Sequence, residues 1–357
     1  MKKVFLYAYD RRNLGDDLFV QTITQRYPDV QFYMWSDKKN RRTYGHLRNL
    51  KVIDKDSLVV RVLNRLRPSL VVRYKNAWIK RCDAVVYIGG SIFMEYENWR
   101  QICNWWEYEA NNRPFYVMGA NFGPWHTEAY RQKMAEIFAK CKDVCFRDRY
   151  SAGLFEGLET VHCAPDILFA HPMPCAAVKD KQLFVSVIDC AGRDESHGLR
   201  EYDAGYITNM AALLRGYLDD GYSLVLSSFC AEEGDETGIA KLTQAMGCEH
   251  DSRVAVLRYD GTNAEEIKRT IAESELVIGT RFHAVILAMA AGRPVLPIVY
   301  SDKTQHVLDD LGFAGAIVDL RSDEPWGRPM VERNSQDVDR EREKAVAHFE
   351  QLDKVLR

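Results

Sequence analysis

Val277-Ile278-Gly279-Thr280-Arg281-Phe282-His283-Ala284 is the stretch that decides the fold, because a short apolar strand ends at Gly279 and a helix of small and apolar residues follows within a few positions. The first turn of a helix presents unpaired backbone N–H groups and the positive end of the helix dipole, so it binds anions. Arg281 adds a fork of donors that matches a carboxylate or a phosphate. His283 adds an imidazole, which in its unperturbed form titrates near neutrality. The turn therefore predicts a reaction on a small anionic substrate.

The same succession of apolar strands and helical stretches continues on both sides of this turn and predicts a doubly wound α/β protein. His171-Pro172-Met173-Pro174 interrupts the succession once, after which it restarts. We therefore expect an N-terminal Rossmann-like domain at residues 1–172, a C-terminal one at 173–335, and a helix at 336–357 that packs back on the first domain. Two α/β halves of this kind predict a substrate cleft between them. The expected strands comprise residues 4–9, 31–35, 84–88, 115–119, 144–146, 183–188, 223–227, 254–258, 277–279 and 295–299.

The composition is that of a globular protein with a substantial core, with 357 residues of which 46% are hydrophobic and 28% are charged. A net charge of -3 gives no reason to expect a nucleic acid as partner. No apolar run approaches the length of a membrane span, and the apolar run at the N-terminus is too short for a signal peptide. The nine cysteines are scattered without a CxxC pair, so we expect reduced thiols and no metal site in a cytoplasmic protein.

Chemistry-bearing residues cluster where predicted strands end, which is where doubly wound sheets bind ligands. Asn13-Leu14-Gly15-Asp16-Asp17 follows the first strand, and Asn and Asp also favour helix starts. We interpret Asp16 as a capping residue, whereas Asp17 is either a cap or a carboxylate near an acceptor hydroxyl. Gly89-Gly90-Ser91 follows another strand and marks either a close backbone approach to a ligand or a tight turn.

Three further positions carry alternatives of the same kind. Arg147, next to Asp148, either forms a surface ion pair or reaches the ligand. Lys303 follows the last predicted strand and is either solvated or directed at the anion held by Arg281. Trp125 lies in a loop and is a candidate platform for a sugar, while the aromatic residues between positions 99 and 108 have the helical spacing of core packing.

The stretch from Lys38 to Arg81 is strongly basic, and apolar residues alternate with arginines at helical spacing around residues 58–66. A solvated helix face is one interpretation. An amphipathic surface that contacts anionic lipid or a lipid-linked pyrophosphate is the other, and it implies peripheral contact with the cytoplasmic face of the membrane. The sequence leaves both open.

Several common sites are missing from the chain. No G-x-G-x-x-G follows the first strand, and neither G-x-x-x-x-G-K-[ST] nor G-x-S-x-G occurs. Dinucleotide binding, P-loop nucleotide binding and serine hydrolysis therefore lose support.

The ordered motifs together resemble those of the polysaccharide pyruvyl transferase family. These motifs are Asn13-x-Gly15-Asp16-Asp17, Gly89-Gly90, Gly123-Pro124, Arg147-Asp148-x-x-Ser151, Asp166, Gly279-x-Arg281-x-His283-Ala284 and Tyr300-x-x-Lys303. The resemblance implies a GT-B-like fold and transfer of pyruvate from phosphoenolpyruvate onto two hydroxyls of one sugar, which gives a cyclic ketal. It also implies donor-site roles for Arg147, Arg281, His283 and Lys303. Two departures lie in the acceptor half: Ser91 replaces the usual third glycine, and the stretch from Lys38 to Arg81 matches no motif.

The resemblance implies a transferase of exopolysaccharide or capsule biosynthesis whose co-substrate is phosphoenolpyruvate and whose acceptor is a glycan or a lipid-linked oligosaccharide. We expect His283 to act as general acid or base, Arg281 to orient the donor, and Asp17 or Glu95 to take the acceptor's proton. Because phosphate departs from carbon, we expect neither a cofactor nor a metal. The alternatives are a GT-B-type glycosyltransferase that uses a nucleotide sugar, and a non-enzymatic glycan-binding protein.

Overall fold

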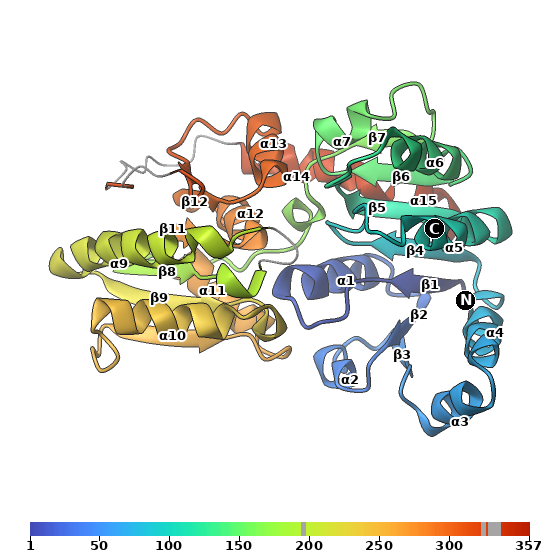
Figure 1. The fold of residues 1–357 in the computed structure, drawn as a ribbon, viewed down its shortest axis with the longest axis horizontal. Coiled ribbons are helices and arrows are strands. Elements are labelled where there is room, and N and C mark those ends of the chain that lie inside the picture. The colour runs from blue at the N-terminus through green and yellow to red at the C-terminus, as the bar shows by residue number, and fades with distance from the viewer. Residues whose placement is uncertain (194–197, 323–325, 328–336) are drawn as a thin grey trace. The chain divides into compact units, whose positions relative to one another are not determined.

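The protein is described by a computed structural model that covers residues 1–193, 198–322, 326–327 and 337–357 (Figure 1). Its contacts divide the chain into two compact units. Unit 1 contains Met1–Asp10, Asp16–Ala170 and Glu343–Arg357, and unit 2 contains Arg11–Gly15 and His171–Arg342. Each unit is an α/β domain with a parallel sheet, as the sequence predicted.

The sheet of unit 1 has seven strands in the order β3-β2-β1-β4-β5-β6-β7, and every pair is parallel. The strands are β1 (Lys3–Tyr7), β2 (Gln31–Ser36), β3 (Leu50–Asp54), β4 (Ala84–Ile88), β5 (Phe115–Ala120), β6 (Asp143–Phe146) and β7 (Val161–Cys163). The central strands read as continuous apolar runs because helices cover both faces of a parallel sheet.

Helices connect the strands of this half. They are α1 (Leu14–Arg26), α2 (Asn40–Thr43), α3 (Leu58–Leu66), α4 (Pro68–Ile79), α5 (Trp99–Asn112), α6 (Glu128–Phe138) and α7 (Arg149–Gly153). On α5, Trp106 is buried and stacks on Tyr87 with ring centroids 4.6 Å apart. This stacking confirms that the tryptophans of α5 serve the core, whereas Tyr108 on the same helix is exposed.

The sheet of unit 2 has six parallel strands in the order β10-β9-β8-β11-β12-β13. The strands are β8 (Lys179–Ser186), β9 (Ser223–Ser228), β10 (Val254–Arg258), β11 (Ser274–Gly279), β12 (Val295–Val299) and β13 (Val318–Asp319). The accompanying helices are α9 (Asp203–Asp219), α10 (Asp235–Met246), α11 (Ala264–Glu273), α12 (Phe282–Ala290) and α13 (Asp302–Asp310). Within the described residues no helix is long and apolar enough to cross a membrane.

Three strands were absent from the sequence prediction, namely β3, β7 and β13. All three lie at an edge of their sheet, and β7 and β13 have only three and two residues. An edge strand has a neighbour on one side only and buries less surface, so it needs no long apolar run. The sequence pattern is correspondingly weak there.

The end of the chain packs on unit 1 through α15 (Glu350–Leu356). Asp353 accepts hydrogen bonds from Arg26 Nη2 at 2.6 Å and from the hydroxyl of Tyr27 at 2.7 Å. Just before this helix, the buried His348 lies with Nε2 2.8 Å from the carbonyl oxygen of Pro165. Residues 343–357 belong to unit 1, on which the helix at 336–357 was expected to pack, whereas residues 11–15 and 171–172, expected in the first domain, belong to unit 2.

Asp353→Ala is expected to lower the free energy of unfolding by about 1–2 kcal/mol in urea denaturation, because two half-buried donors lose their acceptor. Burial alone would raise the pKa of Asp353, but the hydrogen bonds from Arg26 and Tyr27 hold it below the usual value. The contribution is therefore present above about pH 4, the unfolded value, and lost as the pH falls through the lowered pKa. Asp339→Ala, at an exposed ion pair with Arg342, is the control and should leave stability unchanged. Equal effects at both positions would contradict this role for Asp353.

Candidate functional site

The strand order of each sheet reverses at one point. In unit 1 the order reverses between β1 and β4, and in unit 2 it reverses between β8 and β11. Connections on the two sides of such a point leave in opposite directions, so the carboxyl ends of the two strands bound a crevice that commonly holds a ligand. Residues 13–17, residues 89–91 and the turn with Arg281 and His283 follow β1, β4 and β11, whereas Arg147 follows β6 and Lys303 follows β12.

In unit 2 the turn after β11 is held against the end of β8. The backbone N–H groups of Thr280 and Arg281 both donate to the hydroxyl of Ser186, each at 3.0 Å. Ser186 is the last residue of β8 and is fully buried. The hydroxyl of Ser186 therefore fixes the start of α12 at the point where the strand order reverses.

The guanidinium of Arg281 lies between two carboxylates. Its Nε donates to Asp235 at 2.9 Å, its Nη2 donates to the same carboxylate, and its Nη1 donates to Glu233. Arg281 is 6% exposed and Asp235 is 0% exposed. Burial opposes the charge of Arg281, but the two carboxylates hold its pKa well above the usual value.

Asp235 also accepts hydrogen bonds from the backbone N–H groups of Phe229 and Cys230, at 2.8 and 2.9 Å. Arg281 consequently ties the loop between β9 and α10 to the turn between β11 and α12. The structure thus places Arg281 at the predicted turn, with its donors directed at protein carboxylates.

A second arginine, Arg193, shares Glu233 with Arg281. It is buried, and its Nη1 lies 3.5 Å from the hydroxyl of Tyr300, which follows β12. Sequence reasoning missed Arg193, Glu233 and Asp235. The acidic residues directly after β9, at a carboxyl strand end, were the available indication for Glu233 and Asp235, whereas Arg193 belongs to no motif.

His283 is the second residue of α12, and its ring lies against Gly15. A Cβ on Gly15 would lie 1.7 Å from Nδ1 of His283, so only glycine fits there. Asn13 supports this turn, because its side-chain oxygen accepts a hydrogen bond from the N–H of Gly15 at 3.1 Å. The motif Asn13-x-Gly15 is therefore a seat for the imidazole of His283, although 268 positions separate Gly15 from it in the sequence.

In unit 1 the predicted arginine, Arg147, directly follows β6. Its Nη2 donates to the side-chain oxygen of Asn121 at 2.8 Å, and its Nη1 donates to Asp166 at 3.1 Å. A Cβ on Gly90 would lie 2.6 Å from Nη2, so this glycine admits the guanidinium. Ser91 donates its hydroxyl to the same oxygen of Asn121 at 3.3 Å. The structure thus brings Gly90, Ser91 and Arg147 together at the ends of β4, β5 and β6.

The two carboxylates considered as acceptor bases both have hydrogen-bond donors. Asp17 is 1% exposed and accepts from the hydroxyl of Tyr44 at 2.5 Å. Glu95 accepts from the hydroxyl of Thr127 at 2.5 Å and from the backbone N–H of the same residue at 2.8 Å. Burial alone would raise the pKa of Glu95, but these hydrogen bonds hold it below the usual value, which makes it a weaker base. Asp16 lies next to Gly89, whose Cβ would be 3.9 Å from the carboxylate.

The remaining predicted residues are partly exposed. Lys303 is in the first turn of α13 and belongs to unit 2 together with Arg281 and His283, whereas Arg147 belongs to unit 1. Trp125 packs against Phe122, with ring centroids 6.4 Å apart, and keeps part of its surface open. Within the described residues no group of His, Cys, Asp and Glu is arranged to hold a metal ion.

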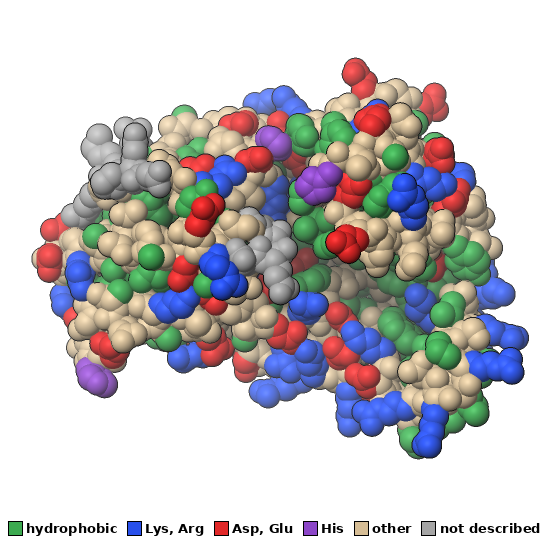
Figure 2. Space-filling view, in the orientation of Figure 1, with side chains coloured by type: hydrophobic (Ala, Val, Ile, Leu, Met, Phe, Trp, Pro, Cys, Tyr) green, Lys and Arg blue, Asp and Glu red, His purple; other side chains and the backbone are tan. Residues whose placement is uncertain are grey.

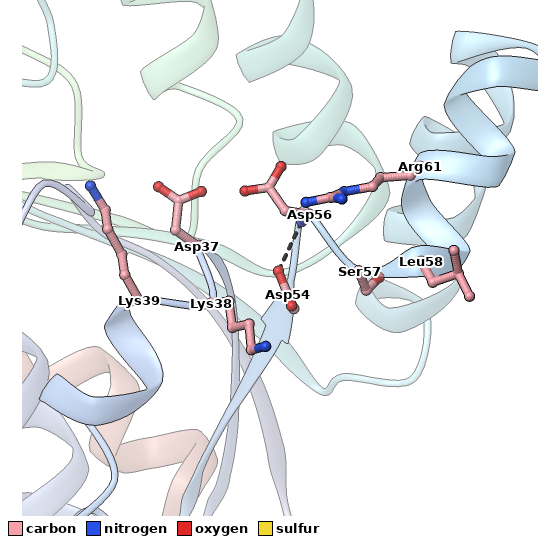
Figure 3. A pocket seen from close by; sticks show the side chains of 8 residues that line it. All are labelled: Asp37, Lys38, Lys39, Asp54, Asp56, Ser57, Leu58 and Arg61. Atoms are coloured by element: carbon pink, nitrogen blue, oxygen red, sulfur yellow. Dashed lines mark hydrogen bonds between the residues drawn. The ribbon is translucent and has the colours of Figure 1, made fainter.

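A pocket of about 520 Å³ lies in unit 1 beyond the ends of β2 and β3 (Figure 3). It is lined by Asp37, Lys38, Lys39, Asp54, Asp56, Ser57, Leu58 and Arg61. Asp54 accepts a hydrogen bond from the N–H of Asp56 at 2.8 Å, and the side chain of Arg61 extends from α3 toward Asp56. Mixed carboxylates and cations of this kind hydrogen-bond polar, hydroxyl-rich ligands. No motif of the sequence marked this pocket.

The fold and the site define a protein of two parallel-sheet α/β domains with arginine and histidine residues at the carboxyl ends of its strands, the architecture of GT-B-like proteins. The chain belongs to the polysaccharide pyruvyl transferase family, whose model matches residues 13–302. It is 23% identical over 306 residues to the amylovoran biosynthesis protein AmsJ of Erwinia amylovora, covering 75% of this chain and 73% of that protein.

Solved structures show the same fold at low sequence identity. HepE of Anabaena, in complex with UDP, is 13% identical, with a TM-score of 0.56 over 100% of this chain and 99% of that one. A putative UDP-N-acetylglucosamine 2-epimerase of Listeria monocytogenes is 10% identical, with a TM-score of 0.57 over 99% of this chain and 90% of that one. These likenesses confirm the GT-B-like fold of the chain.

Gly90→Ala is expected to lower the free energy of unfolding by about 1–3 kcal/mol, because the added methyl group collides with a guanidinium that Asn121 and Asp166 hold in place. Gly153→Ala is the matched control, since a Cβ there meets nothing within 4 Å and the residue is helical. Urea denaturation of both variants measures the difference. If Gly90→Ala were as stable as Gly153→Ala, the guanidinium of Arg147 would move aside without loss of stability, which would contradict its fixed position.

Arg281→Ala is expected to lower the free energy of unfolding by about 3–5 kcal/mol, because the fully buried Asp235 would lose its cation and Glu233 would keep only Arg193. Arg281→Lys keeps the positive charge but loses the bidentate hydrogen bonds of the guanidinium, so its free energy of unfolding should lie between those of the parent and Arg281→Ala. The exposed Arg269→Ala provides the baseline in the same denaturation series. An Arg281→Ala variant as stable as the parent would contradict the anchoring role of the guanidinium.

Proposed function

We propose that the protein transfers pyruvate from phosphoenolpyruvate onto two hydroxyls of one sugar, with formation of a cyclic ketal and release of phosphate. Membership in the polysaccharide pyruvyl transferase family supports the reaction class, and similarity to an amylovoran biosynthesis protein supports a role in exopolysaccharide or capsule synthesis. The observation that carries the proposal is the seat of His283 on Gly15, at the start of α12 and beside the turn that holds Arg281.

We assign the donor to the carboxyl edge of unit 2. Two arginines, Arg193 and Arg281, share Glu233, which is the more exposed of the two acidic partners, with 20% of its side chain open to solvent. An anionic group of phosphoenolpyruvate that displaced Glu233 would gain charge-assisted hydrogen bonds from both guanidinium groups, while the buried Asp235 keeps Arg281 in place. Lys303, on the next strand connection of the same unit, would contact the donor's second anionic group.

The reaction balances without a metal or a redox partner. His283 protonates the methylene carbon of phosphoenolpyruvate, and the resulting oxygen-stabilised cation is attacked by the first sugar hydroxyl. The C–O bond to phosphate then breaks, and the second hydroxyl closes the ketal. Of the two hydroxyl protons, one replaces the proton that reached the methyl group and the other leaves on phosphate.

We assign the acceptor to the carboxyl edge of unit 1. Because Glu95 orders its own loop through Thr127, the better candidates for acceptor base are the carboxylates at the start of α1. Asp17 is held by Tyr44, and Asp16 lies beside Gly89 at the strand-order reversal. We therefore propose that Asp16 accepts the hydroxyl proton and that Asp17 positions this turn. The pocket of Figure 3 and the open part of Trp125 provide polar and stacking contacts for a glycan.

His283→Gln should lower kcat for pyruvyl transfer by at least about 100-fold, because the variant keeps the shape of the side chain and loses proton transfer. The exposed His250→Gln is the control and should behave as the parent. Phosphate release from phosphoenolpyruvate and the mass gain of the sugar acceptor are measured together, with and without EDTA. We expect EDTA to leave the rate unchanged, since phosphate leaves from carbon.

Two outcomes would contradict the proposal. Release of a nucleoside diphosphate from a sugar nucleotide, with no phosphate from phosphoenolpyruvate, would favour a glycosyltransferase of the same fold. Complete loss of turnover in EDTA would show that the reaction needs a metal that this scheme does not include.

A further inference from the structure

Helix α3 exposes most of its apolar residues. Leu58 is 78% exposed, Val59 54%, Val62 49% and Leu66 67%, while Val60 is the buried residue that attaches the helix to unit 1. With Val72 of α4, this short segment contains five of the ten exposed large hydrophobic residues in the described part of the chain. Single exposed apolar residues are common on protein surfaces, but a concentration of this kind indicates an interaction surface.

The exposed apolar residues form one ridge. At 100° per residue, Leu58, Val62, Leu66 and Val59 fall within an arc of about 100° along the helix. Arg61 and Arg65 border this arc, and both are exposed. Their long stems can lie along an apolar surface while their guanidinium groups reach a polar one.

The segment that carries the ridge has charges of a single sign, although Asp37, Asp54 and Asp56 lie near its first residues in the pocket of Figure 3. Residues 57–82 contain Arg61, Arg65, Arg67, Arg73, Lys75, Lys80 and Arg81 and no acidic residue, although the whole chain has a net charge of -3. In the described structure no ion pair joins Arg61, Arg65 or Arg73 to a carboxylate. In Figure 2, Lys and Arg side chains surround hydrophobic ones over α3 and α4.

The combination selects one class of partner. A second copy of the chain would bring two sets of arginines together around the apolar ridge, which costs Coulomb energy. A nucleic acid would engage the basic residues and leave the ridge in water. An anionic lipid surface would bind both the basic residues and the apolar ridge, because its headgroups pair with the arginines and the boundary of its acyl chains takes up the apolar side chains.

We propose that α3 and the start of α4 form a membrane-docking surface, made of Leu58, Val59, Val62 and Leu66 and rimmed by Arg61 and Arg65, that binds the interface of an anionic bilayer. This docking does not rest on pyruvyl transfer. Leu58 and Arg61 also line the pocket of Figure 3, so docking sets the pocket at the lipid surface. If unit 1 binds the acceptor, as proposed above, this placement assigns the acceptor to the lipid-linked saccharides of the same leaflet.

The test is co-sedimentation of the full chain, without substrates, with two kinds of vesicle. One consists of phosphatidylcholine alone, and the other contains about one third phosphatidylglycerol. We expect binding to the anionic vesicles and a loss of at least about tenfold in the partition coefficient for Leu58→Ser/Leu66→Ser and for Arg61→Gln/Arg65→Gln. All four positions are exposed, so circular dichroism should show parental folding.

Matched controls carry the same chemical changes elsewhere. Val178→Ser removes another exposed apolar side chain, and Arg258→Gln/Arg269→Gln removes two exposed charges from unit 2. Both should bind anionic vesicles as the parent does. Three outcomes would overturn the proposal. The first is equal binding of the parent to both vesicle types, and the second is an equal loss of binding in the control and docking variants. The third is a dimer of the parent that Leu58→Ser/Leu66→Ser dissociates, with no vesicle bound. Pyruvyl transfer to a soluble acceptor is assayed separately, so vesicle binding with no transfer would count against the proposed function alone.

Discussion

The reversal of strand order in each parallel sheet is the constraint on which the rest of the structure depends. Parallel strands require crossover connections, and where these leave in opposite directions the carboxyl ends of two strands bound a crevice. In this protein the reversals fall between β1 and β4 and between β8 and β11. The motifs of chemical interest follow the carboxyl ends of strands, so within each unit the topology, rather than proximity in sequence, collects the site residues.

Close approach of side chains to glycine is the second constraint. His283 lies on Gly15 and the guanidinium of Arg147 lies on Gly90, each so near that a methyl group would collide. A glycine in a short motif commonly suggests backbone contact with a ligand. Here both glycines instead make room for a side chain of the protein itself. The fit sets the position of the imidazole and the guanidinium without a hydrogen bond to either glycine.

Charges are distributed differently in the two regions that matter. In unit 2 Arg193 and Arg281 are paired with carboxylates, of which Glu233 is the more exposed and Asp235 is fully buried. Around α3 the basic residues have no acidic neighbours within residues 57–82, and the apolar ridge between them is exposed. The first pattern suits a small anion that replaces an internal carboxylate. The second suits an extended anionic surface.

The sequence by itself determined the α/β class, the two sheets, the long strands and the helical spacing of residues 58–66, because each follows from local periodicity and from apolar runs buried on both faces of a sheet. It also located Arg147, Arg281 and His283 at strand ends. Only the tertiary structure decided that Arg193, Glu233 and Asp235 surround Arg281, that Gly15 seats His283, and that residues 11–15 belong to the second unit. Those contacts join residues far apart in the chain. The edge strands β3, β7 and β13 also escaped prediction, because their one-sided burial leaves little pattern in the sequence.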